Sequence, residues 1–214
     1  MFKLYGAPLS NYYNIVKLAM LEKGLDFEEI YTMPSQAEEF LAISPLGKIP
    51  VLEVREGFIS ETQVIVEFLE DIYPEIPLFP KDPFKKAAVR RLCHISEKYI
   101  DGAARPLLAT VFGGKVLEEH RKSRAVVELK KGVAALEKLA AVKPWLTGEN
   151  FSAADIFAYY CLAFADFIAG RCLDVNIDEL SPVLSPWRRR MAERELVIEL
   201  DRAQQADMQK MLKK

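Results

Sequence analysis

Cysteine is scarce in this sequence, and its positions form no recognisable pattern. Cys93, Cys161 and Cys172 are odd in number and lack metal-ligand spacing. The sequence therefore predicts neither a disulfide framework nor a cysteine-based metal site. Cys161 stands in the apolar stretch FAYYCLAFA, where we expect a small buried hydrophobic residue. Reduced thiols favour a cytosolic setting.

A dominant charge is missing as well. The chain has 29 Lys and Arg residues against 31 Asp and Glu residues, a formal net charge of -2. This balance gives no electrostatic reason to expect binding to nucleic acid or to an anionic membrane. The two histidines, His94 and His120, lie in charged helical segments, so we expect both at the surface.

Long apolar segments are also absent. The start, MFKLYGAPLS, lacks the apolar core of a signal peptide, and no uninterrupted apolar run approaches the roughly 18 residues of a membrane span. We therefore expect a soluble, cytoplasmic protein with no membrane and no nucleic acid among its partners.

The charge is unevenly distributed along the chain. Residues 1–80 contain five Lys or Arg against thirteen Asp or Glu, whereas residues 81–214 contain twenty-four against eighteen. The first part is therefore acidic and the second basic, which suggests two units of different character.

Hydrophobic periodicity predicts alternating strands and helices at the start of the chain. FKLYG at 2–6 reads as a strand, 10–24 as a helix that starts at Ser10 and stops at Gly24, and 26–33 as a parallel strand. A short helix at 36–44 follows. Two strands at 49–54 and 57–60 are joined by a tight turn and form an antiparallel hairpin, and a helix covers 61–74. The order βαβαββα predicts an α/β domain over residues 1–75.

Prolines mark the end of this unit. The stretch PEIPLFPKDP at 74–83 holds four of them, and we read residues 76–83 as a stiff linker. Residues 84–214 read as an all-helical domain. Its helices are expected at about 84–112, kinked at Pro106, at about 115–142, and from SAADIFAYY onward.

Two short stretches of the sequence are candidates for a ligand-binding or catalytic site. Ser10 opens the first helix, where unpaired N–H groups and the helix dipole favour a thiolate or another anion; a simple N-cap explains the same serine. In SPLGKIPVLE, Pro50 stands where a strand begins, and a cis Ile49–Pro50 bond would turn the main chain of Ile49 outward to an extended ligand. Glu61 and Thr62 open the next helix and could meet an amine and a carboxylate, although helix capping also explains them.

Together these residues resemble the cytosolic glutathione transferase family over the whole chain. LYGAPLSNYYNIVKLAMLEKGL is similar to the family's first strand and helix, with Ser10 where serine-type classes such as phi place the catalytic hydroxyl. SPLGKIPVLE looks like the motif N/S-P-x-G-x-V/I-P-x-L, which implies a cis Pro50. SETQVI resembles E-S-x-A-I, with Thr62 in place of serine. LTGENFSAADI resembles the family's capping motif, in which Ser152 and Asp155 hold the start of a core helix.

The resemblance implies a thioredoxin-like first domain and a phi-like bacterial enzyme that joins the glutathione thiolate to hydrophobic electrophiles in detoxification. Ser10 would be catalytic. Glutathione, a co-substrate used without a metal, would be bound by the residues of the two motifs that follow: Lys48, Ile49, Pro50, Glu61 and Thr62. A homodimer is expected, with the acidic first domain of one subunit facing the basic second domain of the other.

The resemblance also implies an electrophile pocket between the domains. We expect it to be lined by Tyr12, Tyr13 and the face of the kinked helix around Leu108 and Phe112. No cysteine stands in the first turn, which argues against omega-type dithiol chemistry.

Some positions depart from the family pattern. Ile15 stands where serine-type classes often carry arginine, and Ser35 and Gln36 stand where basic residues would hold the glycyl carboxylate. Tyr5, Asn11 or Tyr12 could replace Ser10 as the activating group. A glutathione-dependent peroxidase or disulfide reductase, and a non-catalytic regulator built on the same fold, therefore remain open as alternatives.

Overall fold

The computed structural model describes residues 1–114 and 116–212, which form two compact units. The first contains Met1–Leu78 together with the C-terminal segment from Arg194, and the second contains Phe79–Glu193. The sequence placed residues 84–214 together, whereas these contacts put the last helix with the first unit. That helix packs along the first one, where Arg194 Nη2 lies 2.5 Å from Glu22 Oε1.

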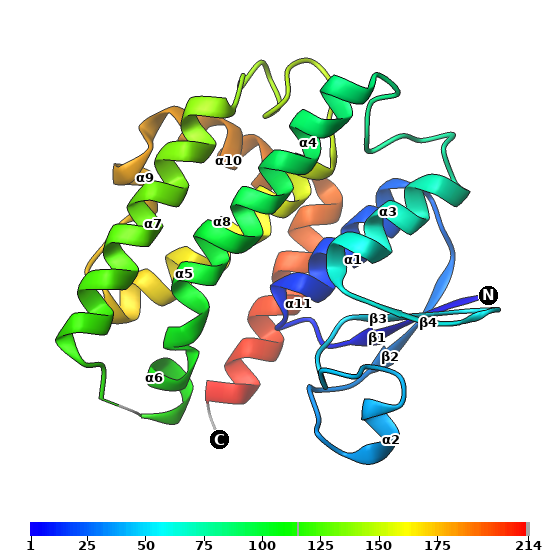
Figure 1. Cartoon of the computed structure of the whole chain (residues 1–214), viewed down its shortest axis with the longest axis horizontal. Coiled ribbons are helices and arrows are strands. Elements are labelled where there is room, and N and C mark those ends of the chain that lie inside the picture. The colour runs from blue at the N-terminus through cyan, green and yellow to red at the C-terminus, as the bar shows by residue number, and fades with distance from the viewer. Residues whose placement is uncertain (115, 213–214) are drawn as a thin grey trace. The chain divides into compact units, whose positions relative to one another are not determined.

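The first unit contains a four-stranded sheet in the order β2-β1-β3-β4 (Figure 1). β1 pairs with β2 in parallel, whereas β1 with β3 and β3 with β4 pair antiparallel. The elements of this unit are β1 (Phe2–Gly6), α1 (Asn11–Glu22), β2 (Phe27–Tyr31), α2 (Glu38–Leu41), β3 (Val51–Val54), β4 (Gly57–Ser60), α3 (Thr62–Ile72) and α11 (Glu195–Leu212). This confirms the predicted order βαβαββα and the thioredoxin-like fold class.

Helix α1 begins and ends where the sequence predicted. Ser10 is its N-cap, and Gly24, with φ of +67°, follows its C-terminal end. α1 packs against α3 and against α11, and the sheet separates α1 and α3 from α2 (Figure 1). The buried side of α1 includes Ile15, Val16 and Leu18, each 0% exposed. The buried Ile15 therefore belongs to the core of this unit.

Lys23 has a role that the sequence did not show. It is the C-cap of α1, and its ammonium group reaches the end of α3. Lys23 Nζ donates to Glu70 Oε2 at 2.7 Å and to the carbonyl oxygens of Tyr73 and Ile76 at 2.8 and 3.0 Å. All three ammonium protons are thus satisfied although the side chain is 0% exposed.

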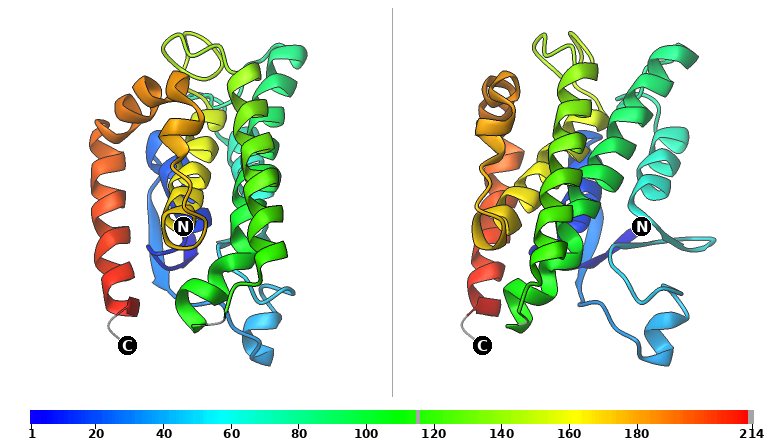
Figure 2. Two further views of the ribbon diagram at one scale, coloured as in Figure 1. Left: turned by 90° about the vertical axis from the view of Figure 1, so that its left-hand side faces the viewer. Right: turned by 60° about the vertical axis from the view of Figure 1, so that its left-hand side comes forward.

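In the described part of the second unit, all the named elements are helices. Its elements are α4 (Pro83–Ile95), η1 (Ser96–Asp101), α5 (Gly102–Ala104), η2 (Arg105–Leu107), α6 (Leu108–Gly113), α7 (Glu119–Leu139), α8 (Ala153–Cys172), α9 (Ile177–Leu180), η3 (Pro182–Leu184) and α10 (Ser185–Ala192). The segment α4–α6 runs beside α7, with α8 packed against α4 and η1 (Figures 1 and 2). Near Pro106, where the sequence predicts a kink, the α-helical hydrogen-bonding pattern is interrupted by the π-helical stretch η1 and, after α5, by the 3-10 turn η2, which contains the proline.

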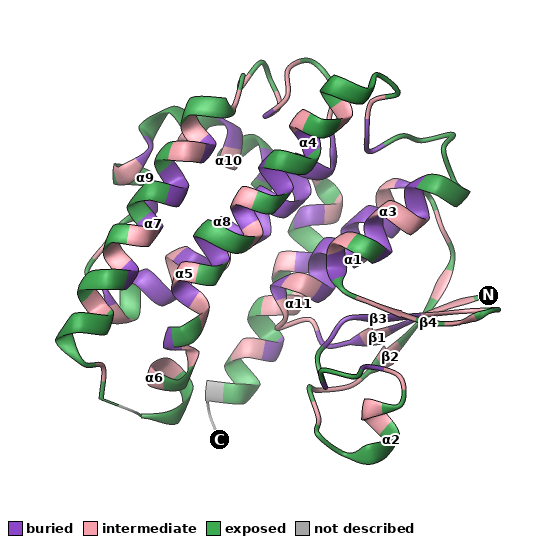
Figure 3. Ribbon diagram, viewed as in Figure 1, coloured by how far each residue is buried: buried purple, intermediate pink, exposed green. Residues whose placement is uncertain are grey.

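Helix α8 is the core helix of this unit, and most of it is buried (Figure 3). Among the described helices it alone is long and apolar enough to cross a bilayer, yet 72% of that apolar window is buried inside the protein. Its start carries the predicted capping box, because the Ser152 side chain accepts from the Asp155 N–H and Asp155 Oδ2 accepts from the Ser152 N–H at 3.0 Å. The Ser152 hydroxyl also donates to Asp155 Oδ2 at 3.1 Å.

Candidate functional site

Three predicted site segments meet at one edge of the sheet. In the strand register, Tyr5 at the end of β1 pairs with Val51 at the start of β3, and Val51 pairs with Ser60 at the end of β4. The Ser10 turn follows β1, Pro50 directly precedes β3, and Glu61 directly follows β4. The antiparallel topology therefore brings together residues that lie up to about fifty positions apart in the sequence.

Ser10 presents its hydroxyl at the amino end of α1. Its Oγ accepts a long hydrogen bond, 3.4 Å, from the Tyr13 N–H, and its own N–H donates to the Ala7 carbonyl at 2.9 Å. Accepting this capping bond leaves the hydroxyl hydrogen free to point elsewhere, because a hydroxyl has one donor and two acceptor positions. A serine here can cap the helix and also donate to an anion at the positive end of the helix dipole.

Two nearby tyrosine hydroxyls are already bonded to carboxylates. Tyr5 Oη donates to Glu53 Oε2 at 2.5 Å, and this bond, with burial, raises the pKa of Tyr5 to about 12. Tyr13 Oη donates to Glu29. The pKa of Tyr13 is raised, mainly by burial and also by this bond. Neither hydroxyl is placed to give its proton to a thiolate.

Tyr13 is a core residue rather than the pocket residue that the sequence analysis expected. Its side chain is 1% exposed, and its ring packs against Gly6, where an added Cβ would lie 2.2 Å from a ring carbon. A glycine is therefore needed at the end of β1. Of the other candidates, Asn11 is buried and Tyr12 is half-buried beside Ser10.

The loop before β3 is shaped by its own side chains. Ser44 Oγ accepts from the Lys48 N–H at 3.0 Å and donates to the Lys48 carbonyl at 2.7 Å. Gly47 has φ of +64°, and a Cβ there would lie 2.2 Å from Gln36 Nε2. The loop ends in a cis Ile49–Pro50 bond, as the motif implied, with Lys48 exposed and Ile49 and Pro50 buried.

Ser35 and Gln36 support this loop. The Ser35 N–H donates to the Gly47 carbonyl at 3.1 Å, and Gln36 Nε2 donates to the Leu46 carbonyl at 3.4 Å. Neither residue is basic. Their position beside the cis-proline loop gives them a structural role that periodicity could not indicate.

Glu61 is held in an unusual backbone conformation. Its φ of 71° and ψ of 115° lie in a region that non-glycine residues rarely adopt, and such a residue costs about 1–3 kcal/mol. Its side chain is exposed and makes no capping hydrogen bond, so capping does not explain this residue. Thr62, the first residue of α3, is 6% exposed. A carboxylate is thus presented to solvent at the same sheet edge as Ser10 and Pro50.

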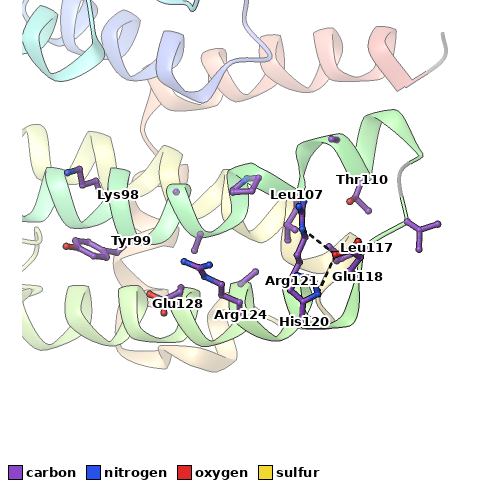
Figure 4. Close-up of a pocket in the computed structure, with 16 residues that line it drawn as sticks. Lys98, Tyr99, Leu107, Thr110, Leu117, Glu118, His120, Arg121, Arg124 and Glu128 are labelled. Carbon is purple, nitrogen blue, oxygen red and sulfur yellow. Dashed lines mark ion pairs between the residues drawn. The ribbon is translucent and has the colours of Figure 1, made fainter. Parts of the chain in front are cut away.

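The second unit contains a cavity of about 830 Å³ between the segment α4–α6 and α7 (Figure 4). Ala103, Pro106 and Leu107 line it from one side, and Arg121 and Arg124 extend from α7. Leu108 and Phe112, the predicted lining of an electrophile pocket, do not line this cavity. Phe112 stacks on Phe167 with ring centroids 6.0 Å apart.

Glu118 lies in the cavity wall beside His120 and Arg121. Its Oε2 lies 3.4 Å from His120 Nδ1 and 3.7 Å from Arg121 Nε (Figure 4). His120 is 74% exposed, in keeping with its expected surface position. In the described ranges 1–114 and 116–212, no group of three or more His, Cys, Asp or Glu side chains could hold a metal ion.

Comparison with known sequences settles the family. The family model for the glutathione S-transferase N-terminal domain matches residues 4–77, and the model for the C-terminal domain matches residues 118–190. A glutathione S-transferase from Pseudomonas putida is 40% identical over 176 residues, which covers 82% of this chain and 80% of that protein. The chain belongs to the glutathione S-transferase family.

Other members of the family are similar over most of the chain. A zeta-class glutathione S-transferase from Euphorbia esula is 33% identical over 161 residues, covering 72% of both proteins. The crystal structure of a glutathione S-transferase from Methylobacterium radiotolerans in complex with glutathione sulfonate is 25% identical, with a TM-score of 0.79, covering 92% of this chain and 93% of that one. The predicted fold and the prediction of a glutathione transferase enzyme are therefore confirmed. The assignment to a serine-type, phi-like class stays a prediction, as do the roles of the individual site residues.

Proposed function

We propose that this glutathione transferase joins the glutathione thiolate to hydrophobic electrophiles at the sheet edge formed by β1, β3 and β4. The observation that supports the proposal most strongly is the strand register, which brings Ser10, Pro50 and Glu61 to one edge. A single extended tripeptide placed there could meet the Ser10 hydroxyl, the main chain beside Pro50 and the Glu61 carboxylate.

In this proposal each binding residue meets a different part of glutathione. The exposed carboxylate of Glu61 pairs with the γ-glutamyl amine, and Thr62 with the γ-glutamyl carboxylate. The main chain of Ile49, set by the cis bond to Pro50, pairs with the cysteinyl unit. Lys48 is exposed and contacts a glutathione carboxylate. The unusual backbone of Glu61 supports its part, because strained residues are often retained where they serve a ligand.

Ser10 activates the thiol in this proposal. A free thiol has a pKa near 8.5, so only a few per cent is ionised at neutral pH. A hydroxyl that donates to the sulfur at the positive end of a helix stabilises the thiolate, and each unit of lowered pKa corresponds to about 1.4 kcal/mol. The thiolate then forms a carbon–sulfur bond with the electrophile, which loses its leaving group or takes up a proton.

The finer assignments are part of the same proposal. The enzyme is a serine-type, phi-like bacterial transferase of the cytoplasm with a role in detoxification, and it works as a homodimer. The acidic character of residues 1–80 and the basic character of residues 81–214 support a dimer held partly by charge.

Calorimetric titration with glutathione, followed by conjugation to 1-chloro-2,4-dinitrobenzene, tests the binding site. Glu61→Gln should weaken glutathione binding about 10-fold or more, because the amine loses a charged partner. Glu56→Gln is the matched control, since Glu56 is exposed in the turn between β3 and β4, away from the proposed edge. No binding at millimolar glutathione would favour a regulator. Turnover of a hydroperoxide but not of the chloroarene would favour a peroxidase.

A further inference from the structure

In each of the two peptide groups that precede Ser10, both the carbonyl oxygen and the N–H make a hydrogen bond. In the Pro8–Leu9 plane, the Pro8 carbonyl accepts from Asn14 Nδ2 at 2.8 Å, and the Leu9 N–H donates to Asp207 Oδ2 at 3.3 Å. In the next plane, the Leu9 carbonyl accepts from Gln204 Nε2 at 3.4 Å, and the Ser10 N–H donates to the Ala7 carbonyl at 2.9 Å. In each plane one of the two bonds comes from α11.

Two residues of helix α11 make the hydrogen bonds to Leu9. Gln204 and Asp207 are three residues apart and so lie on the same face of the helix. Asp207 is only 5% exposed, and its second oxygen, Oδ1, accepts at 3.4 Å from the hydroxyl of Tyr31, the last residue of β2. The helix is fixed further up by Val197 and Leu200, which are 0% and 1% exposed. Figure 1 shows α11 lying beside α1.

We propose that α11 positions the catalytic turn, with Asp207 and Gln204 as positioning residues that fix the direction of the Ser10 hydroxyl. This inference rests on the proposed role of Ser10. The orientation of the Leu9–Ser10 peptide sets where the Ser10 side chain points. A hydroxyl stabilises a thiolate only within hydrogen-bond distance, and a displacement of about 1 Å can cost about 100-fold in rate.

Removing Asp207 has two possible effects on the pKa of the glutathione thiol, and they act in opposite directions. Removing a negative charge near the site would by itself favour a thiolate and lower the pKa of bound glutathione. Loss of positioning would raise that pKa instead. We expect Asp207→Ala to raise the thiol pKa and to lower kcat by roughly 10-fold, with a smaller change in the KM for glutathione. Asp207→Asn keeps an acceptor for the Leu9 N–H and should restore most of the activity.

The experiment combines a double-mutant cycle with hydrogen exchange on the full chain. The effect of Asp207→Ala on kcat and on the thiol pKa is measured with Ser10 and in the Ser10→Ala background, where it should vanish because no hydroxyl remains to be positioned. Exchange of the Leu9 amide should accelerate in Asp207→Ala. Gln204→Ala provides a second variant if Asp207→Ala does not fold. Gln205→Ala, at an exposed neighbouring position, is the matched control.

The outcomes separate this inference from the proposed function. Equal effects of Asp207→Ala with and without Ser10, a lowered thiol pKa, or an unchanged exchange rate of the Leu9 amide would each overturn the positioning role. A thiol pKa that is unchanged in Ser10→Ala, alongside faster Leu9 exchange, would instead overturn the proposed role of Ser10, although the contact between α11 and the turn would stand.

Discussion

Trp187 Nε1 donates a hydrogen bond of 2.8 Å to Asp155 Oδ1, and both residues are 0% exposed. The same carboxylate oxygen accepts from the Leu146 N–H at 2.9 Å, while Oδ2 accepts from Ser152. One buried aspartate thus joins the start of α8, the loop before it and α10. The capping box was predicted from the sequence as a local device, and the structure shows that it also organises the core of the second unit.

Replacement of Asp155 should therefore cost far more than the loss of a helix cap. Asp155→Ala leaves several buried donors without an acceptor, each worth about 1–3 kcal/mol, so we expect a loss of at least about 3 kcal/mol in unfolding free energy. Ser152→Ala, which removes only one hydroxyl of the box, should cost about 1 kcal/mol. Urea unfolding of the two variants measures the difference, and equal losses would show that the contacts to Trp187 and Leu146 contribute little.

Tyr5 should contribute to stability at neutral pH, with a contribution that disappears at high pH, and it should not contribute to conjugation. Its pKa is raised to about 12 by the bond to Glu53 and by burial, so the protonated form is favoured in the folded state. The stability from this bond, about 1 kcal/mol, is present below pH 10 and is lost as the pH rises toward 12. Unfolding experiments should therefore show a difference between wild type and Tyr5→Phe at pH 8 that shrinks above pH 10. Conjugation by Tyr5→Phe at neutral pH should equal wild type. A large loss of turnover would make Tyr5 the activating group.

Glu61→Gly should separate stability from binding. Glycine adopts a positive φ without strain, so this variant should be more stable than wild type by about 1 kcal/mol while binding glutathione more weakly. Val142→Gly is the matched control, because Val142 also has a positive φ, 49°, but lies in the second unit far along the chain from the proposed site. It should gain stability with unchanged glutathione affinity. A Glu61→Gly variant that binds as tightly as wild type would remove Glu61 from the site.

The proposed homodimer should weaken as salt is added. The Debye length falls from about 10 Å at 0.1 M to about 3 Å at 1 M, so attraction between an acidic and a basic surface is largely screened. Sedimentation velocity should show a dimer at low salt and a growing monomer fraction at high salt. A protein that sediments as a monomer at low salt would contradict the proposed homodimer.

Local signals made much of the first unit predictable. Alternating strand residues, the Gly24 stop and the two-residue turn before Gly57 each act within a few positions, and all appear in the structure as predicted. The cis bond at Pro50 was accessible only through the motif around it, because a proline by itself does not report its isomer. The second cis bond, Lys143–Pro144, stands in no motif that we recognised and was missed.

Long-range side-chain contacts could not be predicted from periodicity. Helical spacing placed Tyr13 on α1 but did not show that its hydroxyl bonds to Glu29. It also did not show that Lys23 pairs with Glu70, 47 residues away in the sequence. The bond between Leu9 and Asp207 spans 198 residues. Such contacts depend on how distant elements pack, so the residues that hold the Ser10 turn emerged only from the structure.

The pKa of the thiol of bound glutathione, followed by the ultraviolet absorbance of the thiolate in wild type and in Ser10→Ala, tests the central claim most directly. We predict a value clearly below the roughly 8.5 of a free thiol in wild type and a return toward that value in Ser10→Ala, with glutathione still bound. The same lowered pKa in both proteins would contradict the claim that the Ser10 hydroxyl stabilises the thiolate.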